Sequence, residues 1–182
     1  MPNAAPTKDK LPTVNDAGLH LAVIEAPADS RSKFKYQPDF DAFVLHTILP
    51  AGTSFPYAFG FVPSTLGEDG DALDIVVLAD EPPPVGAVVP CRIVAILLAK
   101  QKQDGETIRN DRLLGIAHAS ERFADCRSKH DVSATLLDRI SEFFAFYHSE
   151  QGKTFEPLGW KGRKAALAAI DAGRKLHAKR NG

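Results

Sequence analysis

The chain lacks an excess of charge of either sign. Its 182 residues include 22 lysines and arginines against 23 aspartates and glutamates, which leaves a formal net charge of −1 at pH 7. A protein that binds nucleic acid through the phosphate backbone carries a basic surface or stripe. The balance of charge therefore argues against a nucleic-acid partner.

Cysteines and long apolar runs are equally scarce. Cys91 and Cys126 are the only cysteines of the sequence. They are too few for a disulfide framework, which favours a reducing compartment such as the cytoplasm. The longest apolar run covers residues 93–99, whereas a membrane-spanning helix needs roughly 20 residues. Residues 1–12 also lack the continuous apolar stretch of a secretion signal. We expect a cytoplasmic location and no membrane partner.

Several familiar catalytic motifs are missing as well. The sequence has no Gly-x-Ser-x-Gly nucleophile elbow and no His-Glu-x-x-His pair. Gly152-Lys153-Thr154 has the ending of a phosphate-binding loop, but the position of the required upstream glycine is held by Tyr147. The corresponding hydrolase and nucleotide-binding classes are therefore not indicated.

The composition that remains is that of an ordinary globular protein. Apolar residues make up 44% of the chain and charged residues 25%, as in typical globular domains. The length allows one domain. We expect a mobile N-terminal tail over residues 1–18, followed by a single domain over residues 19–182.

Short apolar segments separated by glycine and proline predict a first half rich in strands. The expected strands cover residues 21–25, 43–49, 59–62, 73–78, 88–99 and 113–117, with a polar loop over residues 101–110. Farther on, apolar residues recur at helical spacing, at Leu136, Leu137, Ile140, Phe143, Phe144 and Tyr147. A second helix is expected over residues 161–179. Strands followed by helices indicate an α+β fold, mainly β, with a small closed barrel and flanking C-terminal helices.

The strongest chemical feature is a group of three aspartates, Asp69, Asp71 and Asp74, just before the apolar run 75–78. Carboxylates this close stay ionised together only with cations or abundant water nearby. Mg²⁺ prefers such oxygen ligands, but a solvated turn is an alternative, because Asp and Gly favour turns. Asp74 adjoins the apolar run and should be partly buried, where an unpaired charge is costly.

Ordered motifs between Glu25 and Trp160 resemble those of the family I soluble inorganic pyrophosphatases. Residues 69–75 match the pattern Asp, small, Asp, Pro or Glu, apolar, Asp, apolar, except at Ala72. Residues 55–62, aromatic-dense and by themselves typical of core packing, follow the family's frame Tyr-Pro-x-Asn-Tyr-Gly-aromatic-apolar. Shorter matches are residues 23–27, 30–33, 143–147 and 159–160.

The resemblance implies a five-stranded barrel of the OB type that hydrolyses inorganic diphosphate to two phosphates with several Mg²⁺ ions. It implies that Asp69 and Asp74 hold metal, with Asp74 bridging, and that Glu25 holds a metal through water. Asp71 would lie in the same metal site, beside the attacking water, and take its proton. Lys33 and Tyr147 would contact phosphate oxygens. A homo-oligomer is implied in the same way.

The match departs from the family at the site itself. Arg112 and His148 stand at lysine positions and join Lys33 and Tyr147 as expected substrate-binding residues. The other departures are Thr47 for Arg, Lys35 for Glu, Phe55 and Phe59 for Tyr, and Gln101 and Asn110 for Asp. A shift of register would let Asp104 replace a missing aspartate, whereas Asp111 should face away from the site, because side chains alternate along a strand.

These departures predict altered or reduced diphosphatase activity. One alternative is a non-catalytic homologue that binds phosphate compounds in a degenerate site, and another is a hydrolase of a different phosphoanhydride. An OB-type nucleic-acid binder is disfavoured by the neutral total charge and the acidic cluster, because a phosphate backbone needs a positive groove.

Overall fold

A computed structural model describes residues 8–103 and 105–181 of the chain, so that Asp104 lies outside the described residues. The strands are β1 (His20–Ala26), β2 (Ser32–Gln37), β3 (Ala42–Ile48), β4 (Ala58–Phe61), β5 (Asp74–Leu78), β6 (Val88–Gln103), β7 (Glu106–Arg109), β8 (Arg112–Ala117) and β9 (Thr154–Gly162). The α-helices are α1 (Ala134–Ser149) and α2 (Arg163–Asn181). Short 3₁₀ turns cover Lys8–Lys10, Pro38–Phe40 and Lys129–Asp131.

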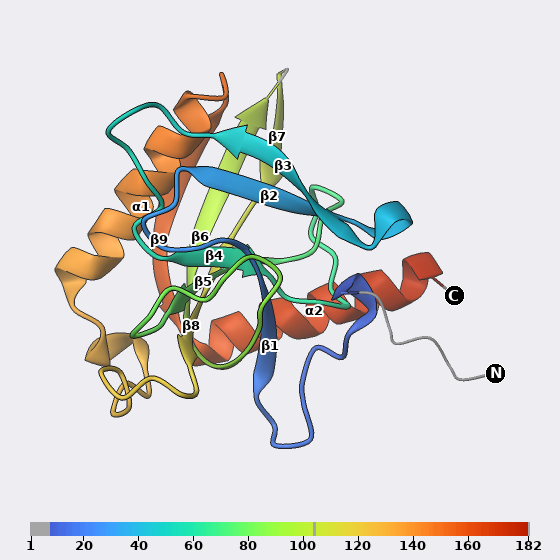
Figure 1. Ribbon diagram of the computed structural model, residues 1–182, viewed down its shortest axis with the longest axis vertical. Coiled ribbons are helices and arrows are strands. Elements are labelled where there is room, and N and C mark those ends of the chain that lie inside the picture. Colours follow the sequence, from blue (N-terminus) through green and yellow to red (C-terminus); the bar gives the residue numbers. More distant parts are fainter. Residues whose placement is uncertain (1–7, 104, 182) are drawn as a thin grey trace.

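Five strands close into a barrel in the order β1-β4-β5-β8-β6, because β6 pairs back onto β1 (Figure 1). All neighbours in this ring are antiparallel except β5 and β8. Closure removes the free sheet edges that would otherwise invite association. The expected α+β fold, mainly β with C-terminal helices around a small barrel, is confirmed.

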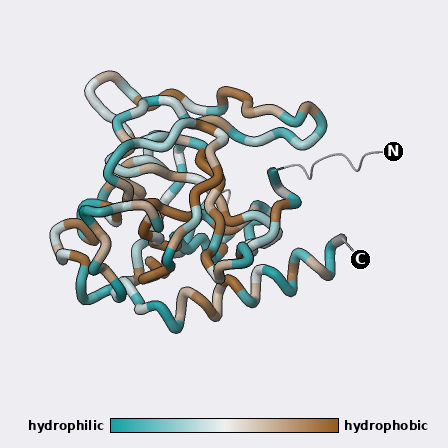
Figure 2. Tube along the Cα trace, turned by 60° about the horizontal axis from the view of Figure 1, so that its bottom comes forward, coloured by the Kyte–Doolittle hydropathy of each residue, from teal (hydrophilic) through white to brown (hydrophobic). Residues whose placement is uncertain are grey.

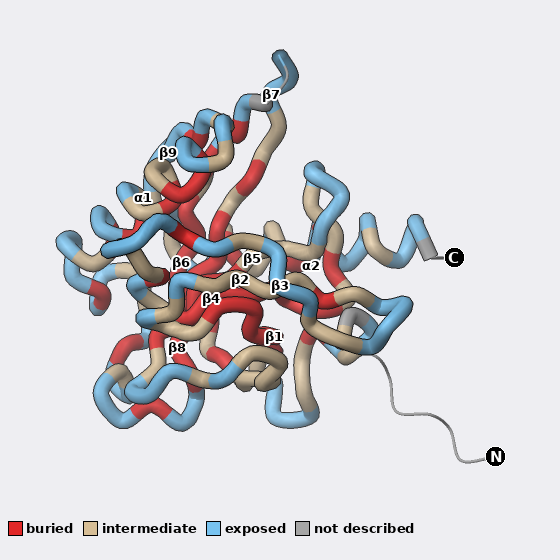
Figure 3. Tube along the Cα trace, turned by 45° about the horizontal axis from the view of Figure 1, so that its top comes forward, coloured by how far each residue is buried: buried red, intermediate tan, exposed pale blue. Residues whose placement is uncertain are grey.

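The barrel strands form where the sequence is most continuously apolar. Every residue of β4 and β8 is buried, and Figure 3 shows the buried segments gathered around the barrel. Where β4 crosses β1, a Cβ on Gly60 would lie 1.9 Å from the Val23 carbonyl oxygen. Only glycine permits this approach, so Gly60 allows the two strands to pair.

Strand β6 is much longer than its barrel neighbours, with 16 residues. Its second half leaves the barrel and pairs with β9 on one side and β7 on the other. The expected polar loop over residues 101–110 is wrong, because β6 and β7 form a hairpin there. The polar side chains of this hairpin give no strand pattern in the sequence, because the hairpin is held by backbone hydrogen bonds rather than by burial.

The helices cover the barrel as their apolar positions indicate. Ser133 caps α1, its Oγ accepting a hydrogen bond from the Leu136 amide at 3.2 Å. Phe144 is fully buried, whereas Phe143 is only partly buried and packs at the edge of the core. Helix α2 begins at Arg163, two residues later than expected, because β9 extends to Gly162. Figure 2 shows apolar stretches recurring along α2, which ends at the C-terminus.

Besides β7, two further strands escaped the sequence analysis, β2 and β9. β2 pairs only with β3, in a hairpin outside the barrel, and β9 pairs only with β6. Both carry many polar side chains, and an edge strand need not be apolar. The β2–β3 hairpin matters for function, because it brings Lys33 and Lys35 to the rim of the barrel.

The segment before β1 lies against the domain from residue 11 onward. Thr13 is buried, and its hydroxyl donates to the Pro63 carbonyl at 3.0 Å. Ser64 donates to the Leu11 carbonyl at 2.8 Å. The division into a tail over residues 1–18 and a domain over residues 19–182 stays a prediction. Within the described residues, neither α-helix is long and apolar enough to cross a membrane.

Candidate active site

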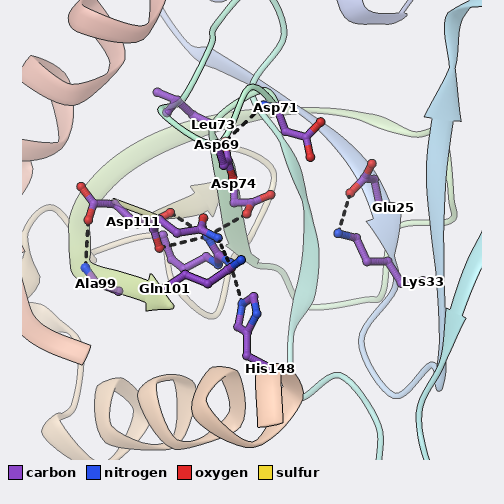
Figure 4. A network of polar contacts seen from close by, with 12 residues as sticks. Glu25, Lys33, Asp69, Asp71, Leu73, Asp74, Ala99, Gln101, Asp111 and His148 are labelled. Atoms are coloured by element: carbon purple, nitrogen blue, oxygen red, sulfur yellow. Dashed lines mark hydrogen bonds and ion pairs between the residues drawn. The ribbon is translucent and has the colours of Figure 1, made fainter. Parts of the chain in front are cut away.

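Side chains from four strands, one loop and one helix lie at one end of the barrel (Figure 4). Glu25 comes from β1, Lys33 from β2, and Asp74 and Arg112 are the first residues of β5 and β8. Asp69 and Asp71 lie in the loop before β5, and His148 lies in the last turn of α1. The residues singled out in the sequence are therefore brought together, although they span more than 120 positions.

Two irregularities in strand pairing aim the first pair of side chains. The ladder between β1 and β4 shifts register at Glu25, and the ladder between β2 and β3 shifts just after Lys33. Such bulges redirect side chains. As a result, Lys33 Nζ lies 3.4 Å from Glu25 Oε2, and both side chains are largely buried.

Burial and charge shift the titration of this pair. Burial raises the pKa of Glu25, although Lys33 beside it acts in the opposite direction. Burial lowers the pKa of Lys33, but Glu25, Tyr147 and Asp74 outweigh it and leave this pKa raised. Lys33 also lies over the Phe59 ring, 4.9 Å from its centroid, a favourable position for a cation. Lys33 is thus held as a permanent positive charge.

The acidic loop is folded by its own backbone. The Gly67 amide donates to the Asp71 carbonyl at 2.7 Å, and Gly70 adopts a left-handed conformation with φ +83°. The Asp71 amide donates to Asp69 Oδ1 at 3.2 Å. This part of the aspartate group is therefore a turn, which was the alternative left open in the sequence, and it also presents carboxylates toward Asp74.

Lys35 reaches across from β2 to the tip of this loop. Its Nζ lies 2.9 Å from both carboxylate oxygens of Asp71, and both side chains are exposed. Burial raises the pKa of Asp69, and the nearby charges of Asp74 and Asp71 add to the effect. The sequence marked Lys35 only as a departure from the family. Its pairing with Asp71 was missed, because the β2–β3 hairpin that carries it was only partly recognised.

Asp74 is paired with a buried arginine. Its Oδ2 lies 2.8 Å from Arg112 Nη1, and the Arg112 side chain is only 2% exposed. The same Nη1 contacts the Asn110 side-chain and backbone oxygens and the Asp111 carbonyl. The guanidinium carbon lies 5.0 Å from the centroid of the Phe144 ring and 5.3 Å from that of Phe155. Arg112 is therefore locked beneath the site.

His148 holds the other end of the guanidinium. Its Nε2 lies 3.0 Å from Arg112 Nη2, and its ring stacks on Phe155 with centroids 4.8 Å apart. Burial, with the charges of Arg112, Lys153 and Lys33, lowers the pKa of His148 to about 3. A guanidinium can only donate, so Nε2 accepts and the imidazole is neutral, with its proton on Nδ1. Arg112 and His148, expected to bind substrate, lie below the surface.

The two amides that replace aspartates bind each other. Asn110 Nδ2 donates to Gln101 Oε1 at 2.6 Å, and both residues are buried. Asp111 lies in the link between β7 and β8 and faces away from the site, as the alternation of side chains predicts. Its Oδ1 accepts from the Ala99 amide at 2.9 Å, and its carboxylate pairs with Arg109 at 2.8 Å, in the direction that Figure 4 shows.

Aromatic rings form the floor between Lys33 and α1. Tyr147 is buried, and its ring lies 5.6 Å from that of Phe55, which stacks on Phe59 at 6.0 Å. Thr47, at the family's arginine position, pairs with Lys33 across the β2–β3 hairpin. The phenylalanines that replace tyrosines thus pack as core residues and supply no hydroxyl to this side of the site.

Comparison with known proteins supplies a family for this arrangement. The family model described as inorganic pyrophosphatase matches residues 22–178. An inorganic pyrophosphatase of Thermus thermophilus is 36% identical over 170 residues, which are 92% of each chain. One from Synechocystis sp. is 34% identical over 162 residues, 89% of this chain and 94% of the relative.

Solved structures agree with the sequence matches. The crystal structure of the Thermus thermophilus inorganic pyrophosphatase superposes with a TM-score of 0.86 at 32% identity, covering 95% of this chain and 99% of that one. The Helicobacter pylori enzyme superposes with a TM-score of 0.84 at 27% identity, covering 93% and 99%. The resemblance read from the motifs is confirmed.

Proposed function

The chain belongs to the inorganic pyrophosphatase family, and from that premise we propose that it hydrolyses inorganic diphosphate to two phosphates with Mg²⁺ as its divalent cation. The observation that carries the proposal is that Lys33, paired with Glu25, and three further carboxylates lie at the same end of the barrel. They are Glu25, Asp69, Asp71 and Asp74. A highly anionic substrate needs fixed cations, and carboxylate oxygens are the ligands that Mg²⁺ prefers.

The roles follow from what each side chain offers. Asp71 is exposed at the loop tip, where it can take a proton from water as that water attacks phosphorus and the bond to the bridging oxygen breaks. Lys33 offers a permanent charge to the phosphate oxygens. Tyr147, buried on α1 beside the Phe55 ring, is proposed to donate a hydrogen bond from its phenolic hydroxyl to a phosphate oxygen. Positioning and charge stabilisation are the main contributions that a protein makes to phosphoryl transfer.

Asp69 and Asp74, with Asp71 and Glu25 beside them, are the proposed holders of the metal. Their chemistry fits a hard cation, since all four are carboxylates. A bound divalent cation supplies charge neutralisation and lowers the pKa of coordinated water.

A reduced activity is the second part of the proposal. Arg112 and His148 are both buried and point at each other rather than outward, so two of the expected substrate contacts are removed from the surface. Loss of a single oxyanion donor costs on the order of 10²-fold in rate. The same observation supports the alternative functions, a phosphate-compound binder without turnover or a hydrolase of another phosphoanhydride.

The test is phosphate release from diphosphate, triphosphate and nucleotide substrates with Mg²⁺. Asp71→Asn should lower turnover of diphosphate by roughly 10²- to 10⁴-fold, the usual contribution of a general base. Asp111→Asn is the matched control, because it makes the same change on a carboxylate that faces Ala99 and Arg109. No phosphate release from any substrate, with diphosphate still bound, would favour the binding protein.

An oligomer of identical chains and a cytoplasmic location complete the proposal. Val44, Leu45 and Ile48 on β3 and Phe40 in the preceding turn are exposed apolar side chains, and Figure 3 shows this hairpin at the outside of the molecule. Exposed apolar patches mark interaction sites, which supports self-association. Cys91 and Cys126 are free thiols, as is usual in a reducing compartment.

A further inference from the structure

The carboxylates of the site are already largely neutralised by the chain itself. Three of the four face a cation of their own, the pairs being Glu25–Lys33 at 3.4 Å, Asp71–Lys35 at 2.9 Å and Asp74–Arg112 at 2.8 Å. His148 adds no charge, since it is neutral. Four carboxylates against three cations leave one uncompensated negative charge, which is little for a cluster of several Mg²⁺ ions.

Of the three cations, Arg112 is the one that cannot move out into water. Its side chain is 2% exposed, and its guanidinium carbon lies over the rings of Phe144 and Phe155. Asn110 and His148 hold its two terminal nitrogens. An incoming metal ion can displace the exposed Lys35 into water, but displacing Arg112 would strand a buried guanidinium, which is costly.

Asp69 is the remaining carboxylate. Among the residues that the structure describes, it is the one site carboxylate without an ion pair, and its contact is with the Asp71 amide at 3.2 Å. Asp74 meets Arg112 through Oδ2, so Oδ1 is its second oxygen available for a metal ion. In residues 8–103 and 105–181, no three His, Cys, Asp or Glu side chains converge as a ready metal site.

We propose that the unliganded site holds one divalent cation, on Asp69 and Asp74, because Arg112, a built-in cation at the family's lysine position, is no longer offset by aspartates at positions 101 and 110. The inference rests on the proposed function and deepens it. The missing carboxylates are at Gln101 and Asn110, where the family has aspartates. Two more carboxylates at these buried positions would surround Arg112 with charge and call for another cation, whereas the amides satisfy each other at 2.6 Å.

The experiment counts metal ions on the full chain. Metal-free protein is titrated with Mn²⁺, and free Mn²⁺ is measured by electron paramagnetic resonance. Wild type should bind one Mn²⁺ per chain. Arg112→Gln removes the built-in cation and should raise the count to two. Asn110→Asp adds a carboxylate beside Arg112 and should raise it to two without removing the guanidinium.

The control is Asn15→Asp, which makes the same chemical change in the N-terminal segment, where Asn15 Oδ1 accepts from the Ala17 and Leu19 amides. It should leave the count at one. Two or more ions on wild type would overturn the inference, as would a count of one in Asn110→Asp. If Arg112→Gln fails to fold, Asn110→Asp decides the question alone.

Phosphate release by wild type separates this inference from the proposed function. Turnover of diphosphate with one bound Mn²⁺ supports both. Turnover with two or more leaves the function standing and overturns the built-in cation. One bound Mn²⁺ without turnover supports the metal count and rejects the hydrolase.

Discussion

The two halves of the candidate site are built differently. On one side, the loop with Asp69 and Asp71 lies at the surface, and Lys35 pairs with Asp71 where both side chains are exposed to water. On the other side, Arg112 and His148 lie beneath the surface among aromatic rings. The surface half keeps the aspartate pattern of the family, and the buried half carries most of the replacements.

The difference shows how a family site changes without losing its fold. In water, a charged side chain is easily exchanged, because solvent screens it and an exposed pair contributes little. In the interior, each polar group needs a partner, so changes must occur together. The replacements at Gln101, Asn110, Arg112 and His148 fit this rule, since each contacts another member of the set.

The largest expected effect is from the buried half. Arg112→Ala should lower the free energy of unfolding by about 3–5 kcal/mol, because it leaves Asp74 without its cation and empties a site between aromatic rings. Urea denaturation monitored by circular dichroism measures the loss. Adding Asp74→Asn to this variant should recover part of it, since the uncompensated carboxylate is then gone. A loss below about 1 kcal/mol would contradict the contrast between the halves.

A smaller effect is expected from acid. The pKa of His148 is lowered to about 3 from its ordinary value of 6.5, so the unfolded chain takes up a proton between these values and the folded chain does not. The stabilisation is complete above about pH 6.5 and is lost as the pH falls toward 3. The loss from this group between pH 7 and pH 5 is about 2 kcal/mol.

Urea denaturation at pH 7 and pH 5 of wild type and His148→Gln tests this. Glutamine keeps an acceptor for Arg112 but does not titrate, so the variant should lose less stability than wild type over this interval. The charged groups that act on His148 are Arg112, Lys153 and Lys33, and they stay unchanged in the comparison. Equal losses in the two proteins would show that His148 is not held neutral.

The smallest effect is expected from the surface half. Lys35→Ala should change the free energy of unfolding by less than about 1 kcal/mol, because the Lys35–Asp71 pair is exposed. Urea denaturation at low and at high salt measures the change, and any difference should shrink as salt screens the pair. A cost as large as that of Arg112→Ala would mean that the two halves are not energetically distinct.

Much of the molecule was predictable from local pattern. The apolar runs predicted the barrel strands, and the spacing from Leu136 to Tyr147 predicted α1, because burial on one face imposes a period on the sequence. The strands β2 and β9 were not predicted, since each lies at an edge and carries polar residues. The hairpin of β6 and β7 was read as a loop for the same reason.

The sequence by itself determined the fold class, the family and the residues that gather at the site, because ordered motifs such as residues 69–75 are contiguous and can be recognised without knowing the fold. Only the tertiary structure decided what those residues do to one another. Nothing in the spacing of Asp74, Arg112 and His148 reveals that they form one chain of contacts that runs from the site into the interior. Partners, burial and therefore charge state depend on which strands and helices meet, and that is a property of the packed molecule.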